Sequence, residues 1–200
     1  MIAKSVLVVA SVGALACSAA MGANVLQNPG FEEGLSWWSG GGVIRGGDPT
    51  PHGGLAYLFG GAVSSYYTYQ MLTPATMGVT EAEIDGGWVE VNFGGWQAGW
   101  GSQRDQGMIE LQFLDASSAT LGTVDLGWFF SDRTWFEMSG TTMTPPGTRS
   151  VIYGFHGQRY DGGNCDAYLD DAYLIPRVVP SGSALSAIAV LGVVAMRRRR

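Results

Sequence analysis

The stretch Trp88-Val89-Glu90-Val91-Asn92-Phe93 alternates apolar and polar side chains. Successive side chains of a β-strand point to opposite faces, so the two valines and the phenylalanine share one face. The glutamate and the asparagine point to the other. This period of two is typical of a strand that packs on a core with one face and meets water with the other.

The same alternation recurs along the chain. Ile109, Leu111 and Phe113 share a face, with Glu110 and Gln112 opposite. Further alternating runs occupy residues 54–60, 65–72, 120–127, 133–141, 151–155 and 169–175. Gly, Pro, Asp and Ser turns separate them, and no long stretch has a 3.6-residue apolar period. Nine or ten such strands predict an all-β, antiparallel sandwich or barrel.

The N-terminus has the pattern of a secretory signal peptide. Lys4 supplies the positive charge, residues 6–16 are apolar, and small residues follow up to Ala23. Cleavage after Ala20 and cleavage after Ala23 both satisfy the small-residue rule. We therefore expect residues 1–23 to be a signal peptide and the remainder to be exported.

The C-terminus predicts attachment to a membrane. An apolar run at residues 184–196 precedes four arginines, 197–200. Thirteen helical residues span about 20 Å, short of a hydrocarbon core of about 30 Å, and snorkelling arginines narrow that gap. By the positive-inside rule the arginines favour a cytoplasmic C-terminus, which leaves the domain outside the cell.

Residues 178–200 resemble a PEP-CTERM sorting signal, which joins a short Pro-containing motif, an apolar helix and an arginine cluster. The resemblance implies sorting by an exosortase-type processing enzyme in the cell envelope of a Gram-negative-type bacterium. Val179-Pro180-Ser181-Gly182 keeps the first proline of that motif but lacks its glutamate and second proline. Whether the tail is cleaved or retained as an anchor stays open.

Charge and cysteine content narrow the function of the middle part, residues 24–177. It carries all 17 acidic residues against six arginines, a net charge of −11. Such a surface repels nucleic acid, so we exclude a nucleic-acid partner. Cys17 belongs to the signal peptide and leaves Cys165 alone, so the mature domain has no intrachain disulfide.

Residues 24–175 resemble galactose-binding-like jelly rolls, a group that includes several families of carbohydrate-binding modules. The resemblance rests on the order of five segments. They are Asn24-Val25-Leu26-Gln27-Asn28-Pro29-Gly30-Phe31-Glu32, His52-Gly53-Gly54-Leu55-Ala56-Tyr57-Leu58, Leu111-Gln112-Phe113-Leu114-Asp115-Ala116, Pro146-Gly147-Thr148-Arg149-Ser150-Val151 and Tyr168-Leu169-Asp170-Asp171-Ala172-Tyr173-Leu174. It implies an antiparallel jelly-roll β-sandwich.

The same resemblance implies a structural Ca²⁺ ion between the first and last strands. Its ligands would be the carboxylates of Glu32 and Asp170 and main-chain oxygens of Gly30 and Leu55. Carboxylate and carbonyl oxygens are the ligands that Ca²⁺ prefers. The alternative is that both acidic residues cap turns or face solvent.

Aromatic residues supply the hypothesis on ligand binding, because sugar rings stack on flat aromatic side chains while polar groups bind the hydroxyls. The glycine-rich segment 94–105 combines Trp96 and Trp100 with Gln97, Gln103 and Arg104. Of Trp37 and Trp38 we expect one ring inside and one near the surface, and Trp38 is assigned to the ligand site. Three other tryptophans are expected to pack in the core: Trp88, Trp128 and Trp135.

Motifs for catalysis are absent from the sequence. The two histidines, His52 and His156, lack a second ligand at metal-binding spacing, and there is no nucleophile elbow or phosphate loop. The sequence therefore predicts a non-catalytic, surface-associated protein that binds extracellular or cell-surface polysaccharide. Two alternatives stay open: a structural protein of the envelope or exopolysaccharide matrix, and a secreted glycoside hydrolase whose paired carboxylates the sequence cannot show.

Overall fold

The computed structural model describes residues 22–179. In this range the chain forms ten strands and one short helix. The strands are β1 (Ser39–Gly40), β2 (Val43–Arg45), β3 (Tyr57–Gly61), β4 (Ser65–Leu72), β5 (Val89–Ala98), β6 (Gln106–Leu114), β7 (Thr120–Asp125), β8 (Phe136–Met143), β9 (Ser150–Gln158) and β10 (Cys165–Val178), and the helix is α1 (Glu81–Asp85). The all-β prediction is confirmed.

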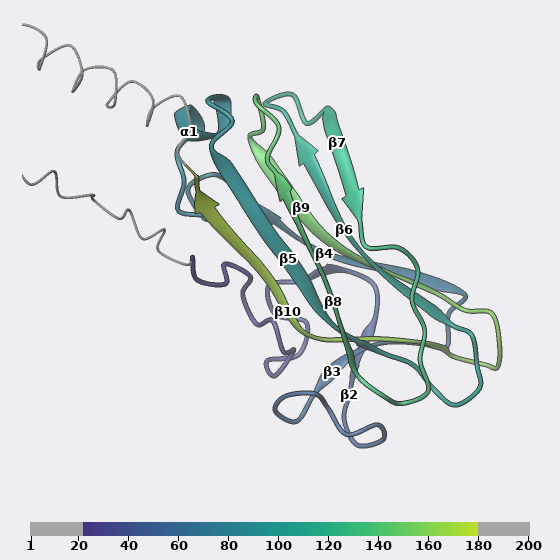
Figure 1. Cartoon of the computed structure of the whole chain (residues 1–200). Coiled ribbons are helices and arrows are strands. Elements are labelled where there is room, and N and C mark those ends of the chain that lie inside the picture. The colour runs from purple at the N-terminus through teal and green to yellow at the C-terminus, as the bar shows by residue number, and fades with distance from the viewer. Residues whose placement is uncertain (1–21, 180–200) are drawn as a thin grey trace, which may run out of the picture.

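The strands form two five-stranded sheets that pack face to face (Figure 1). The first sheet has the order β1-β4-β9-β6-β7, and the second has the order β2-β3-β10-β5-β8. All pairings are antiparallel. Neighbours in a sheet are mostly distant in sequence, so each sheet surface combines residues from separate parts of the chain.

The core lies between the sheets and is built by the alternating residues of each strand. Val89, Val91 and Phe93 of β5 are buried, as are Ile109 and Leu111 of β6. Their polar neighbours point outward, as the period of two requires. The runs at 65–72, 109–113 and 151–155 coincide with strands, whereas the short strands β1 and β2 have too few residues for a periodic signal.

Strand β10 is the centre of the second sheet. Its first half pairs with β3, and β5 pairs with it from Tyr168 to Val178. Beside the second half, where β3 has ended, the N-terminal segment takes over: the Val25 N–H donates to the Leu174 carbonyl at 2.9 Å. The register shifts between Asp170 and Tyr173, and Asp171 has a φ of 44°. This bulge turns two adjacent carboxylates toward the N-terminal segment.

The sequence predictions for the two ends fall mainly outside the described residues. The signal peptide (1–23) is described only at Gly22 and Ala23, and the sorting segment (178–200) only at Val178 and Val179. Between residues 22 and 179, no helix has the length and apolar character needed to cross a membrane.

Candidate functional site

The outer face of the first sheet carries a group of aromatic and polar side chains that we call the first-sheet cluster. Its members are Tyr67 and Tyr69 of β4, Glu110 and Gln112 of β6, and His156 of β9. The pairing of β4 with β9 sets Tyr67 opposite His156, and the pairing of β6 with β9 sets Glu110 opposite Gly154. The cluster therefore spans three adjacent strands.

The rings of this cluster lie close together. The centroids of Tyr67 and Tyr69 are 5.3 Å apart with planes inclined by 20°, and those of Tyr67 and His156 are 4.4 Å apart. Gly154 makes room for this arrangement, because a Cβ there would stand 2.5 Å from the Tyr67 hydroxyl oxygen. The missing side chain lets Tyr67 lie across β9 and form a platform with its neighbours.

Polar groups surround the platform. Glu110 Oε1 accepts a hydrogen bond from Gln112 Nε2 at 2.6 Å and lies 3.2 Å from His156 Nε2. The Tyr67 hydroxyl is buried and has no hydrogen-bond partner within the described chain. Burial, and then the charge of Glu110, raises the pKa of Tyr67 to about 12, so the hydroxyl keeps its proton. The cluster thus offers donors and acceptors beside flat rings.

An exposed tryptophan borders the cluster. The Phe129 N–H donates to the Gly107 carbonyl at 2.8 Å, which fixes the segment after β7 against β6. Trp128 is 48% exposed, and its ring centroid is 6.3 Å from that of His156. The prediction that Trp128 packs in the core is wrong, because its strand-like context belongs to a connection that passes over the edge of the sheet.

The residues predicted to bind ligand from the 94–105 segment do not form one site. Trp96 lies on the outer face of β5, where the His52 ring stacks on it with centroids 3.7 Å apart. Gln97, the next residue, points inward and is buried, with no hydrogen-bond partner for its amide in the described chain. Strand alternation therefore separates two residues that the sequence had grouped.

The remaining members of that segment lie in the loop after β5. The guanidinium carbons of Arg133 and Arg45 are 3.9 and 5.1 Å from the Trp100 ring centroid. Gln103 is half-buried against Gly162, and Arg104 is exposed, its backbone N–H donating to Asp161. Trp100 is thus a platform for two arginines of the same chain.

Trp38 is a core residue. Its ring stacks on Phe31 with centroids 4.9 Å apart, and its indole N–H donates to the Asn28 carbonyl at 3.0 Å. Trp37 is the exposed member of the pair, at 67%. One ring is inside and one outside, as expected, but the assignment of Trp38 to a ligand site is wrong because its face is covered.

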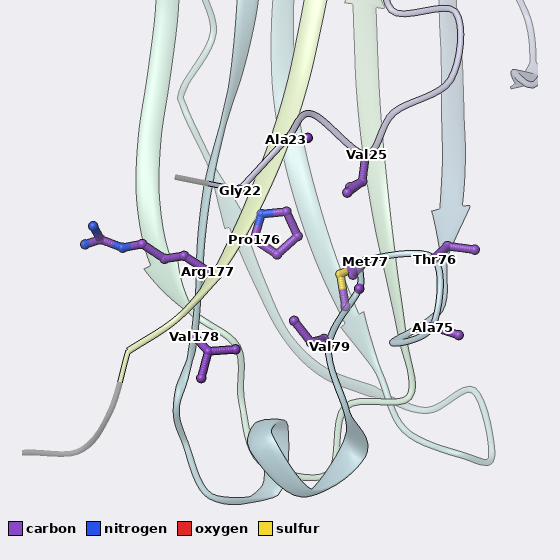
Figure 2. Close-up of a pocket in the computed structure, with 11 residues that line it drawn as sticks. Gly22, Ala23, Val25, Ala75, Thr76, Met77, Val79, Pro176, Arg177 and Val178 are labelled. Atoms are coloured by element: carbon purple, nitrogen blue, oxygen red, sulfur yellow. The ribbon is translucent and has the colours of Figure 1, made fainter. Parts of the chain in front are cut away.

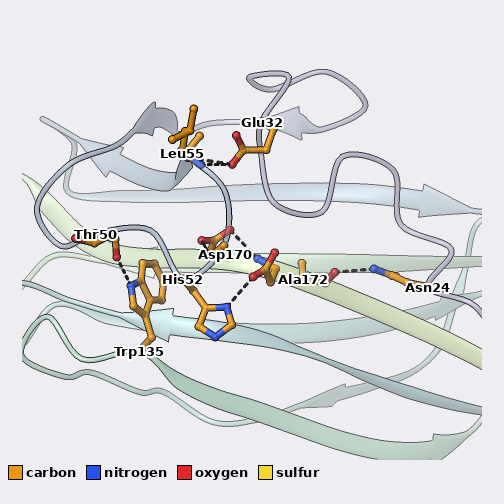
Figure 3. A network of polar contacts seen from close by, with 11 residues as sticks. Asn24, Glu32, Thr50, His52, Leu55, Trp135, Asp170 and Ala172 are labelled. Carbon is orange, nitrogen blue, oxygen red and sulfur yellow. Dashed lines mark hydrogen bonds and ion pairs between the residues drawn. The ribbon is translucent and has the colours of Figure 1, made fainter.

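The structure brings the predicted calcium carboxylates to one loop, residues 52–56 (Figure 3). Glu32 Oε1 accepts hydrogen bonds from the Leu55 and Ala56 N–H groups at 2.8 and 3.0 Å, and Asp170 Oδ2 accepts one from the Gly53 N–H at 3.1 Å. Leu55 therefore meets Glu32 with its N–H, and its carbonyl lies against Gly46 instead. The assignment of the Leu55 carbonyl as a ligand is wrong in this arrangement.

Asp170 is the unusual acid of this region. It is fully buried, and burial raises its pKa to about 7 despite the hydrogen bond from Gly53. Gly30, the other predicted ligand, lies beside it: a Cβ there would stand 3.6 Å from Asp170 Oδ1. A buried carboxylate whose charge is incompletely balanced fits a cation. Against this, within residues 22–179 no three His, Cys, Asp or Glu side chains gather closely enough to hold a metal.

A pocket of about 500 Å³ lies elsewhere, between the N-terminal segment, the end of β10 and the loop before α1 (Figure 2). Its walls include Val25, Met77, Val79 and Pro176, with Arg177 at the margin. No aromatic ring lines it within the described residues. It lacks the flat surfaces and paired polar groups of the first-sheet cluster, so we do not assign it a carbohydrate.

Comparison with known proteins supports the fold alone. No protein-family model matches the chain, and no curated protein matches it in sequence. The enzymatically active domain of tailspike protein 4 from bacteriophage CBA120 matches with a TM-score of 0.56 and 14% identity. The match covers 76% of this chain and only 21% of that one, so this chain spans about a fifth of the tailspike domain's length.

Two smaller structures match over their whole length. The CBM22-1 xylan-binding domain of Xyn10C from Paenibacillus barcinonensis gives a TM-score of 0.51 and 17% identity, covering 82% of this chain and 100% of that one. This chain has the jelly-roll fold of carbohydrate-binding modules. A cyclase from Fischerella sp. TAU gives a TM-score of 0.53 and 12% identity, and the match again covers 82% of this chain and 100% of that one. Since binding modules and enzymes both match the fold, function must be argued from the surface.

Proposed function

We propose that this protein binds extracellular or cell-surface polysaccharide non-catalytically through the first-sheet cluster. The observation that carries the proposal is the pair of stacked tyrosines, Tyr67 and Tyr69, beside Glu110 and His156. Sugar rings stack their C–H faces on such rings, and the carboxylate and imidazole bind hydroxyls. The cluster lies on the outer face of the first sheet, bordered by the exposed ring of Trp128.

The decisive experiment is affinity electrophoresis of the full chain in gels that contain soluble xylan, galactan or glucan. We expect retardation by at least one polysaccharide, and Tyr69→Ala should weaken it about tenfold, because half of the tyrosine platform is lost. Leu121→Ala, an exposed change at the edge of the same sheet, is the matched control. Unchanged retardation of the Tyr69 variant would refute the assignment of the site.

A glycoside hydrolase is the second candidate, because β6 and β7 pair Glu110 with Asp125. Glycosidases need two carboxylates flanking the bond that breaks. Asp125 Oδ1 accepts the Gly127 N–H at 2.9 Å, a turn contact that occupies one of its oxygens. Release of reducing ends by the wild type and its loss in Glu110→Gln would establish hydrolysis. Their absence, with binding retained, agrees with the non-catalytic proposal.

We also propose that Glu32 and Asp170 hold a structural Ca²⁺ ion together with a main-chain oxygen of Gly30. Support comes from their convergence on residues 52–56 and from the burial of Asp170. The ion would supply positive charge that balances these acids and would join the N-terminal segment to β10. Export, envelope localisation and exosortase sorting are further proposals, and these rest on the sequence of the two termini.

A further inference from the structure

The outer face of the second sheet repeats the arrangement of the first-sheet cluster. A tyrosine again lies across a glycine of the neighbouring strand: a Cβ at Gly94 would stand 2.6 Å from the Tyr173 hydroxyl oxygen. The Tyr173 hydroxyl donates to Glu137 Oε1 at 2.8 Å. The three residues come from β10, β5 and β8, just as Tyr67, Gly154 and Glu110 come from three adjacent strands.

A tryptophan extends this second group. The pairing of β5 with β8 sets Trp96 opposite Glu137 and Gly94 opposite Ser139. His52 stacks on Trp96 and is itself held by Asp171, with Nδ1 and Oδ2 2.6 Å apart. We call Trp96, Glu137, Ser139 and Tyr173 the second-sheet cluster. His52 covers one face of the Trp96 ring, so a sugar would use the other face. Beside that ring the cluster offers a carboxylate and hydroxyls, which is the chemistry that binds sugars.

A shallow pocket of about 320 Å³ continues this surface along β5. Its walls include Asn92, Thr141 and the ion-paired side chains Glu90 and Arg177. The Asn92 amide donates to the Thr141 hydroxyl at 3.1 Å. Amides, hydroxyls and charged groups therefore continue along β5 beyond Tyr173. An extended polysaccharide would need such groups to bind the hydroxyls of its successive sugars.

We infer that the second-sheet cluster is a second polysaccharide-binding surface and that the domain links two polysaccharide chains. The inference rests on the proposed function of the first-sheet cluster. The two clusters occupy opposite outer faces of a sandwich whose sheets are about 10 Å apart, so a chain lying on one face leaves the other free for a second. Two weak sites on one rigid body gain strength from multivalency and join the chains they hold.

The test is the turbidity of a solution of the full chain with a soluble polysaccharide that retards it in gels. Wild-type protein should produce turbidity that passes through a maximum with protein concentration and then falls as sites saturate. Glu137→Ala and Tyr173→Phe remove the polar partners of the second-sheet cluster without opening a core cavity. Each should abolish turbidity while gel retardation falls no more than about threefold. Val63→Ala, an exposed loop change away from both clusters and from the proposed Ca²⁺ site, should behave as wild type.

The outcomes separate the two proposals. Turbidity that Glu137→Ala and Tyr173→Phe leave unchanged, or wild-type binding with no turbidity at any ratio, would overturn the second site and leave the first intact. Failure of every polysaccharide to retard the wild type would overturn the proposed function and this inference with it. Sedimentation of the free protein at the turbidity maximum serves as control, because self-association alone would also join chains and would count against a second site.

Discussion

Gly154 determines the position of the Tyr67 ring, since any side chain at this position would meet the end of that ring. The contact involves the tip of a side chain and not backbone, so the fold can accommodate a methyl group by moving Tyr67. The effect of a substitution should therefore fall on the platform of the first-sheet cluster more than on stability.

We predict that Gly154→Ala lowers polysaccharide affinity about fivefold, as expected for a loss of about 1 kcal/mol of aromatic contact. Gly163→Ala is the matched control, because a Cβ at Gly163 would meet open space. Affinity electrophoresis measures the binding, and thermal unfolding checks that both variants fold. Equal affinity of the two variants would contradict the role given to Tyr67.

Asp166 is a second residue with a defined electrostatic environment. It is buried and accepts a hydrogen bond from the Tyr168 hydroxyl at 2.7 Å, and Arg45 lies 3.9 Å away. Burial raises its pKa above the ordinary value of 3.8, and this outweighs the Tyr168 hydrogen bond that lowers it. The folded state therefore binds a proton more tightly than the unfolded state does.

Because the folded pKa of Asp166 is the higher one, its contribution to stability is full below pH 3.8 and is lost as pH rises through the folded pKa. We predict that Asp166→Asn becomes more stable relative to wild type as pH rises from 4 to 7. Urea unfolding at several pH values, with chelator present, measures the difference. Asp132→Asn removes an exposed carboxylate and should show no such trend; a flat difference for Asp166→Asn as well would be inconsistent with the raised pKa.

At the scale of elements, alternation in the sequence identified both the strands and the direction of their side chains. Residues 109–113 were predicted to place Ile109, Leu111 and Phe113 on one face and Glu110 and Gln112 on the other, and β6 has this arrangement. The same pattern in 65–72 puts Tyr67 and Tyr69 on one face. These patterns could have identified the first-sheet cluster from the sequence. The prediction favoured residues 94–105 instead, because that segment contains two tryptophans.

Strands β6 and β7 provide a matched pair for stability. Leu111 is fully buried between the sheets, whereas Leu121 of the neighbouring strand is 42% exposed. We predict that Leu111→Ala lowers the free energy of unfolding by about 2–5 kcal/mol through a cavity and lost burial. Leu121→Ala should cost less than about 1 kcal/mol. Urea unfolding of both variants checks this, and similar losses would mean that the core does not lie where described.

At the scale of the whole molecule, the proposed Ca²⁺ site joins parts of the chain that are far apart in sequence. Glu32 belongs to the N-terminal segment and Asp170 to the last strand, and both contact residues 52–56. Cys165 is free and buried, so no disulfide restrains these parts in the described chain. Binding of a cation only to the folded state must stabilise it.

We predict that Ca²⁺ raises the unfolding midpoint of the full chain above its value in chelator. At a Ca²⁺ concentration about a hundred times the dissociation constant, the free energy of unfolding should increase by about 2.7 kcal/mol. Asp170→Asn should abolish the response, and Asp132→Asn should keep it. Differential scanning fluorimetry with Ca²⁺, Mg²⁺ and chelator makes the comparison. Identical midpoints in Ca²⁺ and in chelator would remove Glu32 and Asp170 as ligands.

Strand alternation is a local property of the backbone, so the pattern of apolar and polar residues was enough to predict the all-β class and the inward and outward faces of the main strands. The tertiary structure decided which strands are neighbours. Tyr67, Glu110 and His156 lie 43 to 89 positions apart in sequence. The strands that carry them all alternate with the same period of two, so the pattern does not show which strands are neighbours. Periodicity therefore assigns each residue to a face, but only the pairing of distant strands brings these residues into one binding surface.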